Sequence, residues 1–167
     1  WKRDNAQPIQ EEIDRLTGIT LSNVAFEPLD SLVPIASVPL NSKVINASVD
    51  ADGILLVKMQ DYDHKNMFSE DLTQGIVELF GHITKSPIYK VVILTGFENY
   101  FASGGTKEDL LAIQEGKTKF TDTKFYHLAA ACKIPVISAM QGHAIGAGWS
   151  FGMFADFILF SDESKYL

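Results

Sequence analysis

Three features are scarce in this chain of 167 residues: cysteine, excess positive charge and long apolar runs. The single cysteine, Cys132, has no partner for an internal disulfide and lies in the apolar stretch LAAACKIP, so we expect a buried structural thiol. The formal net charge of −7 argues against broad binding to nucleic-acid phosphates. No apolar run approaches the roughly 20 residues that span a bilayer, and we identify no signal segment at the start. We therefore expect a cytoplasmic protein.

The remaining composition is that of a globular protein, with 46% hydrophobic and 21% charged residues. Residues 1–43 contain Pro28, Pro34 and Pro39 without a steady apolar period, apart from a short helix expected at Pro8–Leu16. We interpret residues 1–43 as an N-terminal extension or interdomain linker. The single α/β domain is expected at residues 44–167.

Strands and helices alternate in a regular order within residues 44–167. Strands are expected at 44–49, 54–60, 91–95, 135–140 and 156–160, the first two joined by a hairpin turn at 50–53. Helices are expected to begin at Ser69 and Thr106, both of which can cap, at about 121 (running to 132), and after 148 (running to about 153). Because Val91–Thr95 shows no polar alternation, we expect it to be buried on both faces. The order indicates an α/β domain with stacked sheets.

Two of the expected buried strands lead into glycine turns, and each turn opens a helix. The first turn contains FASGGT at residues 101–106, and the second contains QGHAIGAG at residues 141–148. Backbone N–H groups at such turns can bind an anion or a developing oxyanion. The second turn has neither the G-x-G-x-x-G spacing of a dinucleotide site nor the Lys-Ser/Thr ending of a phosphate loop. Taken singly, each turn is also compatible with an ordinary connection or with close helix packing.

Taken together, VVILTGFENYFASGGTKEDL and IPVISAMQGHAIGAGWSFGMFADFILFSDESKY resemble the crotonase (enoyl-CoA hydratase/isomerase) superfamily, from about Val44 to the end. The resemblance implies a ββα spiral with stacked sheets, incomplete at the C-terminus here, and assembly as a homotrimer. It also implies that the N–H groups of Gly105 and Ala147 hold the carbonyl oxygen of an acyl thioester and stabilise its enolate. The residues that it places against the substrate are His64, Lys65, Asn66, Met67, Ala102, Gly104, Gly142 and Ser150.

One position disfavours water addition. Hydratases of this superfamily carry a glutamate three residues beyond the second donor, where this chain has Ser150, so the general base is missing. The segments YFASGGT, TKFTD, AMQGHAIG and FADFILFSDES are similar to the decarboxylating crotonases of curacin- and bacillaene-type polyketide β-branching. The resemblance implies a lyase that converts 3-methylglutaconyl on an acyl carrier protein to 3-methylcrotonyl and CO2 through a dienolate. No metal or redox cofactor is expected, because the thioester is itself the electron sink.

Lys119 is the candidate for the side chain that acts on the leaving carboxylate, since the resemblance places a functional lysine in this loop. The alternative is that Lys117, Lys119 and Lys124 are solvated surface charges. The proton-donating histidine of the family is expected in a C-terminal third that this sequence does not reach, and we interpret His143 as structural. Two alternative functions stay open: an enoyl-CoA hydratase, dehydratase or isomerase, and a non-catalytic scaffold with the crotonase fold.

Overall fold

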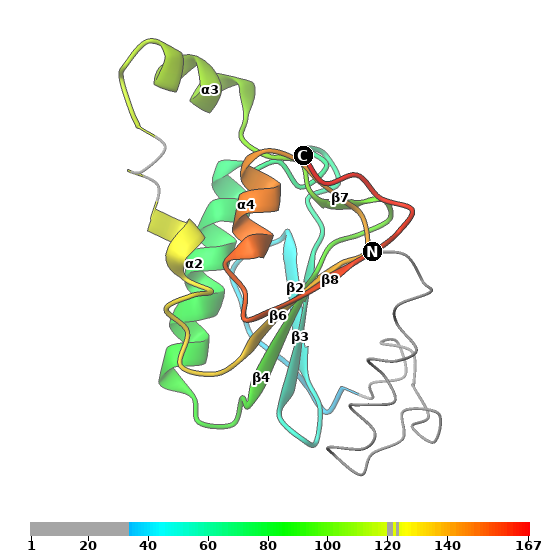
Figure 1. The fold of residues 1–167 in the computed structure, drawn as a ribbon. Helices are drawn as coiled ribbons and strands as arrows, with labels where there is room; N and C mark the ends of the chain where they lie inside the picture. Colours follow the sequence, from blue (N-terminus) through cyan, green and yellow to red (C-terminus); the bar gives the residue numbers. More distant parts are fainter. Residues whose placement is uncertain (1–33, 120–121, 123) are drawn as a thin grey trace. The chain divides into compact units, whose positions relative to one another are not determined.

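The computed structural model describes residues 34–119, 122 and 124–167. The helix expected at Pro8–Leu16 and most of the expected extension lie outside these residues. The main sheet has the strand order β1-β2-β3-β4-β6-β8, antiparallel from β1 to β3 and parallel from β3 to β8 (Figure 1). Its strands are β1 (Ala36–Ser37), β2 (Ile45–Val49), β3 (Ile54–Met59), β4 (Val91–Thr95), β6 (Val136–Met140) and β8 (Phe157–Phe160).

The expected hairpin joins β2 and β3. Asp50 closes the turn, because its Oδ1 accepts the amides of Asp52 (2.9 Å) and Ile54 (2.8 Å), while Gly53 adopts a φ of 85° that favours glycine. The sheet extends upstream of this hairpin, since Ala36–Ser37 pairs with the far edge of β2. The first strand therefore lies before Val44, where we placed the start of the domain.

The α2 helix (Glu70–Lys85) begins as its sequence predicts. The Ser69 side chain accepts the Leu72 amide, and Glu70 and Asp71 occupy the first turn, where negative charge stabilises a helix. All five apolar residues of the expected face are buried: Leu72, Ile76, Leu79, Phe80 and Ile83. They join one core cluster with the inward side chains of the sheet.

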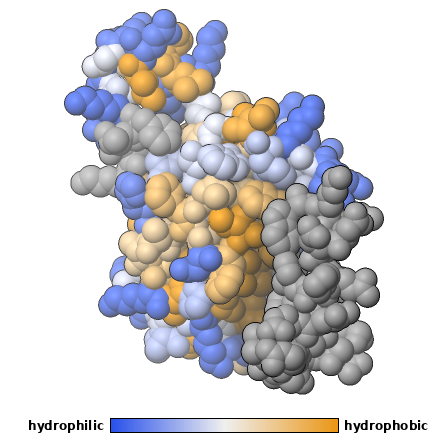
Figure 2. All heavy atoms as spheres, viewed as in Figure 1, coloured by the Kyte–Doolittle hydropathy of each residue, from blue (hydrophilic) through white to orange (hydrophobic). Residues whose placement is uncertain are grey.

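The expectation that β4 is buried on both faces was wrong. Val92 and Leu94 are fully buried beneath the helices, whereas Val91 and Ile93 are only partly buried. The same difference is stronger at the edge strand β8, where Phe157 and Leu159 are both 61% exposed. Hydrophobic side chains are accordingly visible on the surface of the molecule in Figure 2.

A second, two-stranded sheet pairs β5 (Tyr100–Ala102) with β7 (His143–Ala144) and so joins the two glycine turns. Each turn opens a helix, α3 (Lys107–Gln114) after the first and α4 (Ala147–Met153) after the second. The α3 helix has no buried residue and projects from the rest of the domain (Figure 1). No helix among the described residues has both the length and the apolar character needed to cross a membrane.

The helix expected at residues 121–132 is also not observed. The structure has a short 3-10 helix, η5 (Lys124–His127), followed by turns. The adjacent Phe125 and Tyr126 are both buried, and both rings contact Phe68. This aromatic packing overrides the weak helical preference of the segment.

Candidate active site

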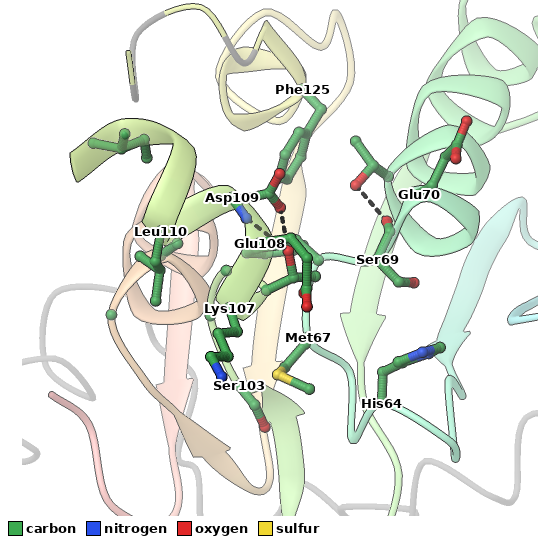
Figure 3. Close-up of a pocket in the computed structure, with 18 of the residues that line it drawn as sticks. His64, Met67, Ser69, Glu70, Ser103, Lys107, Glu108, Asp109, Leu110 and Phe125 are labelled. Carbon is green, nitrogen blue, oxygen red and sulfur yellow. Dashed lines mark hydrogen bonds between the residues drawn. The ribbon is translucent and has the colours of Figure 1, made fainter. Parts of the chain in front are cut away.

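Both glycine turns line a single cavity of about 1110 Å³ (Figure 3). The first turn contributes residues 103–106, and the second contributes residues 145–147. The facing walls come from the loop before α2, the first turn of α2, one side of α3 and η5. Segments that are far apart in the sequence therefore surround one volume large enough for a substrate.

The two turns are in direct backbone contact. The Ile145 amide donates to the Ala102 carbonyl at 3.0 Å. A Cβ atom at Gly104 would lie 2.9 Å from the Ile145 oxygen and 3.8 Å from the Ala147 nitrogen, and one at Gly148 would lie 2.2 Å from the Ala102 oxygen. Only residues without a side chain allow this approach, so the glycines hold the two turns that carry the candidate donors against each other.

The two candidate donors, the amides of Gly105 and Ala147, donate to no residue that the structure describes. Ala147 is the first residue of α4, and an N–H at that position has no partner within its helix. Both residues are partly exposed and line the cavity. An oxygen atom bound between the two turns could accept hydrogen bonds from both.

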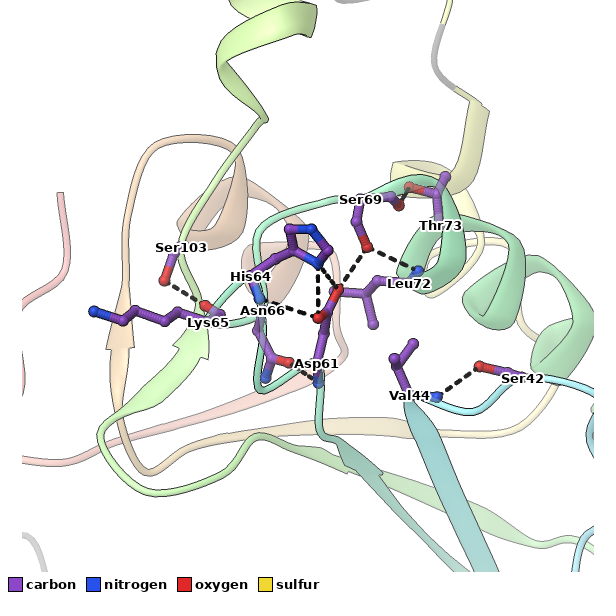
Figure 4. A network of polar contacts seen from close by, with 10 residues as sticks. All are labelled: Ser42, Val44, Asp61, His64, Lys65, Asn66, Ser69, Leu72, Thr73 and Ser103. Atoms are coloured by element: carbon purple, nitrogen blue, oxygen red, sulfur yellow. Dashed lines mark hydrogen bonds and ion pairs between the residues drawn. The ribbon is translucent and has the colours of Figure 1, made fainter.

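A buried carboxylate organises the loop before α2. Asp61 is 3% exposed and accepts hydrogen bonds from His64 Nδ1 (2.9 Å) and Ser69 Oγ (2.6 Å), as Figure 4 shows. Its hydrogen bond and negative charge raise the pKa of His64, with smaller contributions from Asp63 and Asp71. Since His64 also lines the cavity, an imidazole held by the Asp61 carboxylate lies at its edge.

One wall of the cavity is aromatic. Phe125 and Tyr126 stack with ring centroids 4.0 Å apart, and both pack on Phe68. Burial, with a contribution from the charge of Asp109, raises the pKa of Tyr126 to about 12. The Tyr126 hydroxyl is therefore protonated at neutral pH, within a wall that is otherwise apolar.

The cavity brings together part of the expected site. The expected residues that line it are Gly105, Ala147, His64, Met67 and Gly104. Those outside its lining are Lys119, Lys65, Asn66, Ala102, Gly142 and Ser150. Lys119 is exposed, and its amide donates to Asp122 Oδ2 at 2.9 Å. Ala102 and Gly142 are buried against neighbouring backbone, and Ser150 Oγ donates to the Gly146 carbonyl at 3.3 Å.

Several lining residues were not anticipated from the sequence. They come from the first turn of α2, from α3 and from η5, and include Glu70, Asp71, Leu110, Ile113, Phe125 and Tyr126. The two caps were recognisable, but nothing in the sequence shows that the two capped helices face one cavity. Among the described residues, no group of three or more His, Cys, Asp or Glu side chains is arranged to hold a metal ion.

Curated proteins with similar sequences include a decarboxylase and a CoA dehydratase. The chain is 58% identical over 113 residues to the bacillaene synthase decarboxylase PksI of Bacillus subtilis, covering 68% of this chain and 45% of the relative. It is 33% identical over 120 residues to carnitinyl-CoA dehydratase of Escherichia coli, covering 69% of this chain and 45% of the relative. The chain thus spans about half the length of the curated relatives that it matches.

Solved structures agree with this relationship. One belongs to a dehydratase/decarboxylase enzyme couple involved in polyketide β-branching, with a TM-score of 0.74 and 52% identity over 77% of this chain and 51% of the other. The decarboxylase domain of CurF from Lyngbya majuscula has a TM-score of 0.67 and 38% identity over 74% and 50% of the two chains. The family model for enoyl-CoA hydratase/isomerase matches residues 50–167, a range that contains both glycine turns, and the chain belongs to this family.

Proposed function

We propose that this protein decarboxylates a 3-methylglutaconyl-type acyl thioester on an acyl carrier protein, giving a 3-methylcrotonyl thioester and CO2 in polyketide β-branching. The 58% identity to a bacillaene synthase decarboxylase carries this proposal, because it is far higher than the identity to the CoA dehydratase. The family resemblance further implies a homotrimer in the cytoplasm, with no metal or redox cofactor.

The proposed reaction places charge where the cavity offers donors. When the C–C bond to the carboxylate breaks, its electron pair moves through the double bond into the thioester carbonyl, and CO2 leaves. The resulting dienolate carries its negative charge on the carbonyl oxygen, between the amides of Gly105 and Ala147. Because these donors bind the charged oxygen more strongly than the neutral carbonyl, each contributes about 3–4 kcal/mol to the stability of the transition state. Protonation at carbon then restores a neutral thioester.

The wall of the cavity suits loss of a charged group. The rings of Phe125 and Tyr126 are buried and mostly apolar, so this side offers a carboxylate few polar groups. We propose that Lys119 orients the leaving carboxylate so that the breaking bond aligns with the π system. An ion pair alone favours the ground state, where the carboxylate charge is complete, so orientation is the useful part of this role.

Water addition is the second candidate, favoured by the 33% identity to carnitinyl-CoA dehydratase. Against it stands Ser150, at the position where hydratases of the superfamily carry a glutamate. Its hydroxyl donates to the Gly146 carbonyl within α4 and does not line the cavity. Nothing at this position can deprotonate a water molecule.

Mass spectrometry of the carrier-bound product separates the candidates. The purified protein is incubated with 3-methylglutaconyl thioester on an acyl carrier protein and, in parallel, on CoA. We expect a loss of about 44 mass units, faster on the carrier protein. A change of about 18 mass units would instead indicate hydration or dehydration. An unchanged substrate would favour a non-catalytic scaffold, provided that a reference decarboxylase converts the same material.

A further inference from the structure

The loop between β3 and α2 contains an unusual backbone conformation. Lys65 and Asn66 have φ values of 52° and 53°, in the left-handed region that residues with a Cβ atom rarely adopt. Two consecutive residues in this region require compensating contacts from their surroundings. The Asn66 side chain supplies these contacts.

The Asn66 side chain has no exposed surface, and both hydrogens of its amide group are used. Its Nδ2 donates to the Met59 carbonyl (2.9 Å) at the end of β3 and to the Phe101 carbonyl (3.0 Å) in β5. Its Oδ1 accepts the Asp61 amide at 2.8 Å. Asn66 therefore connects β3 to β5, the strand that leads into the first glycine turn, and its side chain is closed off from any ligand.

The backbone around Asn66 holds the first turn directly. The Asn66 carbonyl accepts the Ser103 amide at 3.0 Å, and the Lys65 carbonyl accepts Ser103 Oγ at 2.6 Å (Figure 4). The residue after Ser103 is held in the same way, because the Gly104 carbonyl accepts the Phe68 amide at 2.8 Å. These bonds fix the residues that precede Gly105.

The last of these bonds also sets the direction of the candidate donor. The carbonyl of Gly104 and the N–H of Gly105 belong to one peptide unit, which is planar and trans, so they point in opposite directions. Because the Gly104 oxygen is bound to the Phe68 amide, the Gly105 N–H points away from Phe68. Rotation of this peptide unit would turn the donor away from a bound oxyanion.

We propose that Asn66 is a positioning residue that aims the Gly105 amide, through the left-handed turn and the Ser103–Gly104 backbone, and that it does not bind substrate. The inference rests on the proposed function, in which Gly105 stabilises the dienolate. It assigns Asn66 a role different from the substrate contact that the family resemblance implied. Ser103 serves the same end through its hydroxyl, although it also lines the cavity.

Steady-state kinetics of Asn66→Asp test the proposal, with Asn46→Asp as the matched control. The substitution keeps the shape of residue 66. It replaces Nδ2, which donates to the Met59 and Phe101 carbonyls in the wild type, with an oxygen that faces the same carbonyls. Asn46 is exposed on β2, so the same change there alters charge without touching the turn. Since small misplacements of a catalytic group can cost up to about 100-fold in rate, we expect Asn66→Asp to lower kcat by about 10- to 100-fold, with KM within about threefold of wild type. Asn46→Asp should match the wild type.

A second variant and a readout independent of turnover guard against a folding defect. Ser103→Ala removes the hydroxyl bond to the Lys65 carbonyl and leaves the backbone bonds of the turn in place, and we expect kcat to fall by about three- to tenfold. In NMR hydrogen exchange, the Phe68 and Ser103 amides should lose protection in Asn66→Asp, while the Leu94 amide in β4 keeps it. Loss of protection at Leu94 as well would show global destabilisation, and Ser103→Ala then decides.

Two results would overturn the positioning role. One is an unchanged kcat in folded Asn66→Asp or, if that variant is unstable, in Ser103→Ala. The other is a raised KM with unchanged kcat in folded Asn66→Asp, which would show direct substrate contact. Failure of the proposed function looks different, because the wild type itself would then release no CO2. In that case, loss of protection at the Phe68 and Ser103 amides alone would still support the brace between the two loops, and retained protection would refute it.

Discussion

Replacing Ala147 with proline deletes one proposed oxyanion donor and leaves the helix that carries it intact. Ala147 is the first residue of α4, the helical position that proline tolerates best because no intrahelical N–H bond is lost there. Its amide donates to no described residue. The preceding Gly146 has φ 55° and ψ −119°, the mirror image of the extended conformation that residues before proline adopt, which glycine can occupy.

The expected cost follows from the number of donors. Removing one of two donors from an oxyanion site lowers kcat by about 100- to 1000-fold, or about 2.7–4 kcal/mol in the activation barrier. Proline also places its Cδ atom where the amide hydrogen was and would crowd the bound oxygen, so a loss of about 100-fold in kcat is the minimum that we expect. The free energy of unfolding should change by no more than about 0.5 kcal/mol, because no described hydrogen bond is lost.

CO2 release from the carrier-bound thioester measures kcat, and urea unfolding measures stability. Ala147→Gly is the control, because it keeps the N–H and the small size of the residue, and we expect it to retain most of the activity. If folded Ala147→Pro turns over within about threefold of wild type, the second donor is elsewhere and the two-amide site is wrong.

Three further predictions concern other parts of the domain. Lys119→Ala should lower kcat for CO2 release by about tenfold. Lys117→Ala should have little effect, since Lys117 pairs with Glu115 at 2.6 Å in solvent. A larger loss of kcat in Lys117→Ala than in Lys119→Ala would assign the carboxylate role to Lys117. Asp61→Asn should lower the pKa of His64 towards 6.5 in an NMR titration, because the hydrogen bond and charge of Asp61 are the main causes of its elevation; an unchanged value would contradict that cause. By linkage, the His64–Asp61 contact stabilises the folded state fully below the unfolded pKa of His64, about 6.5, and this stabilisation is lost as pH rises through the raised folded pKa. As pH rises from about 6.5 through the folded pKa, the free energy of unfolding of the wild type should therefore fall relative to that of Asp61→Asn. Ser138→Ala should raise the free energy of unfolding by about 1 kcal/mol, because Ser138 Oγ is buried and has no hydrogen-bond partner among the described residues; a less stable variant in urea unfolding would reveal a partner for that hydroxyl.

The local structure of the domain was largely predictable where a chemical signal marks each boundary. Ser69 and Thr106 cap α2 and α3 as expected, because their hydroxyls accept amides three residues further along the chain. The Asp50–Gly53 turn forms the expected hairpin for the same reason, through one carboxylate and one left-handed glycine. His143, which we interpreted as structural, accepts the Lys165 amide through Nδ1 and so makes a contact with a distant segment of the chain.

The failures occur where tertiary contacts decide the outcome. The apolar run of β4 predicts burial but does not show how much of each face other elements cover. In η5, Phe125 and Tyr126 carry a helical pattern, yet their burial against Phe68 is set by a residue more than fifty positions away. The aromatic wall of the cavity therefore cannot be predicted from the residues next to Phe125 and Tyr126 in the sequence, and no spacing rule would have identified Tyr126 as a cavity residue.

Backbone donors are a special case, because the sequence indicates them only through neighbouring glycines, which lack a side chain. A Cβ atom at Gly142 would lie 2.3 Å from the Asn99 carbonyl carbon, and one at Gly148 would lie 2.2 Å from the Ala102 oxygen. Each clash marks a close contact between the second turn and the segment 99–102, which leads into the first turn some forty residues earlier in the chain. By contrast, a Cβ atom at Gly105 would meet only the Leu110 side chain, at 3.8 Å. Gly105 itself is therefore not required for packing, and the contribution that we propose for it lies in its N–H. This predicts that Gly105→Ala folds and retains activity, whereas Gly148→Ala separates the two turns and loses it.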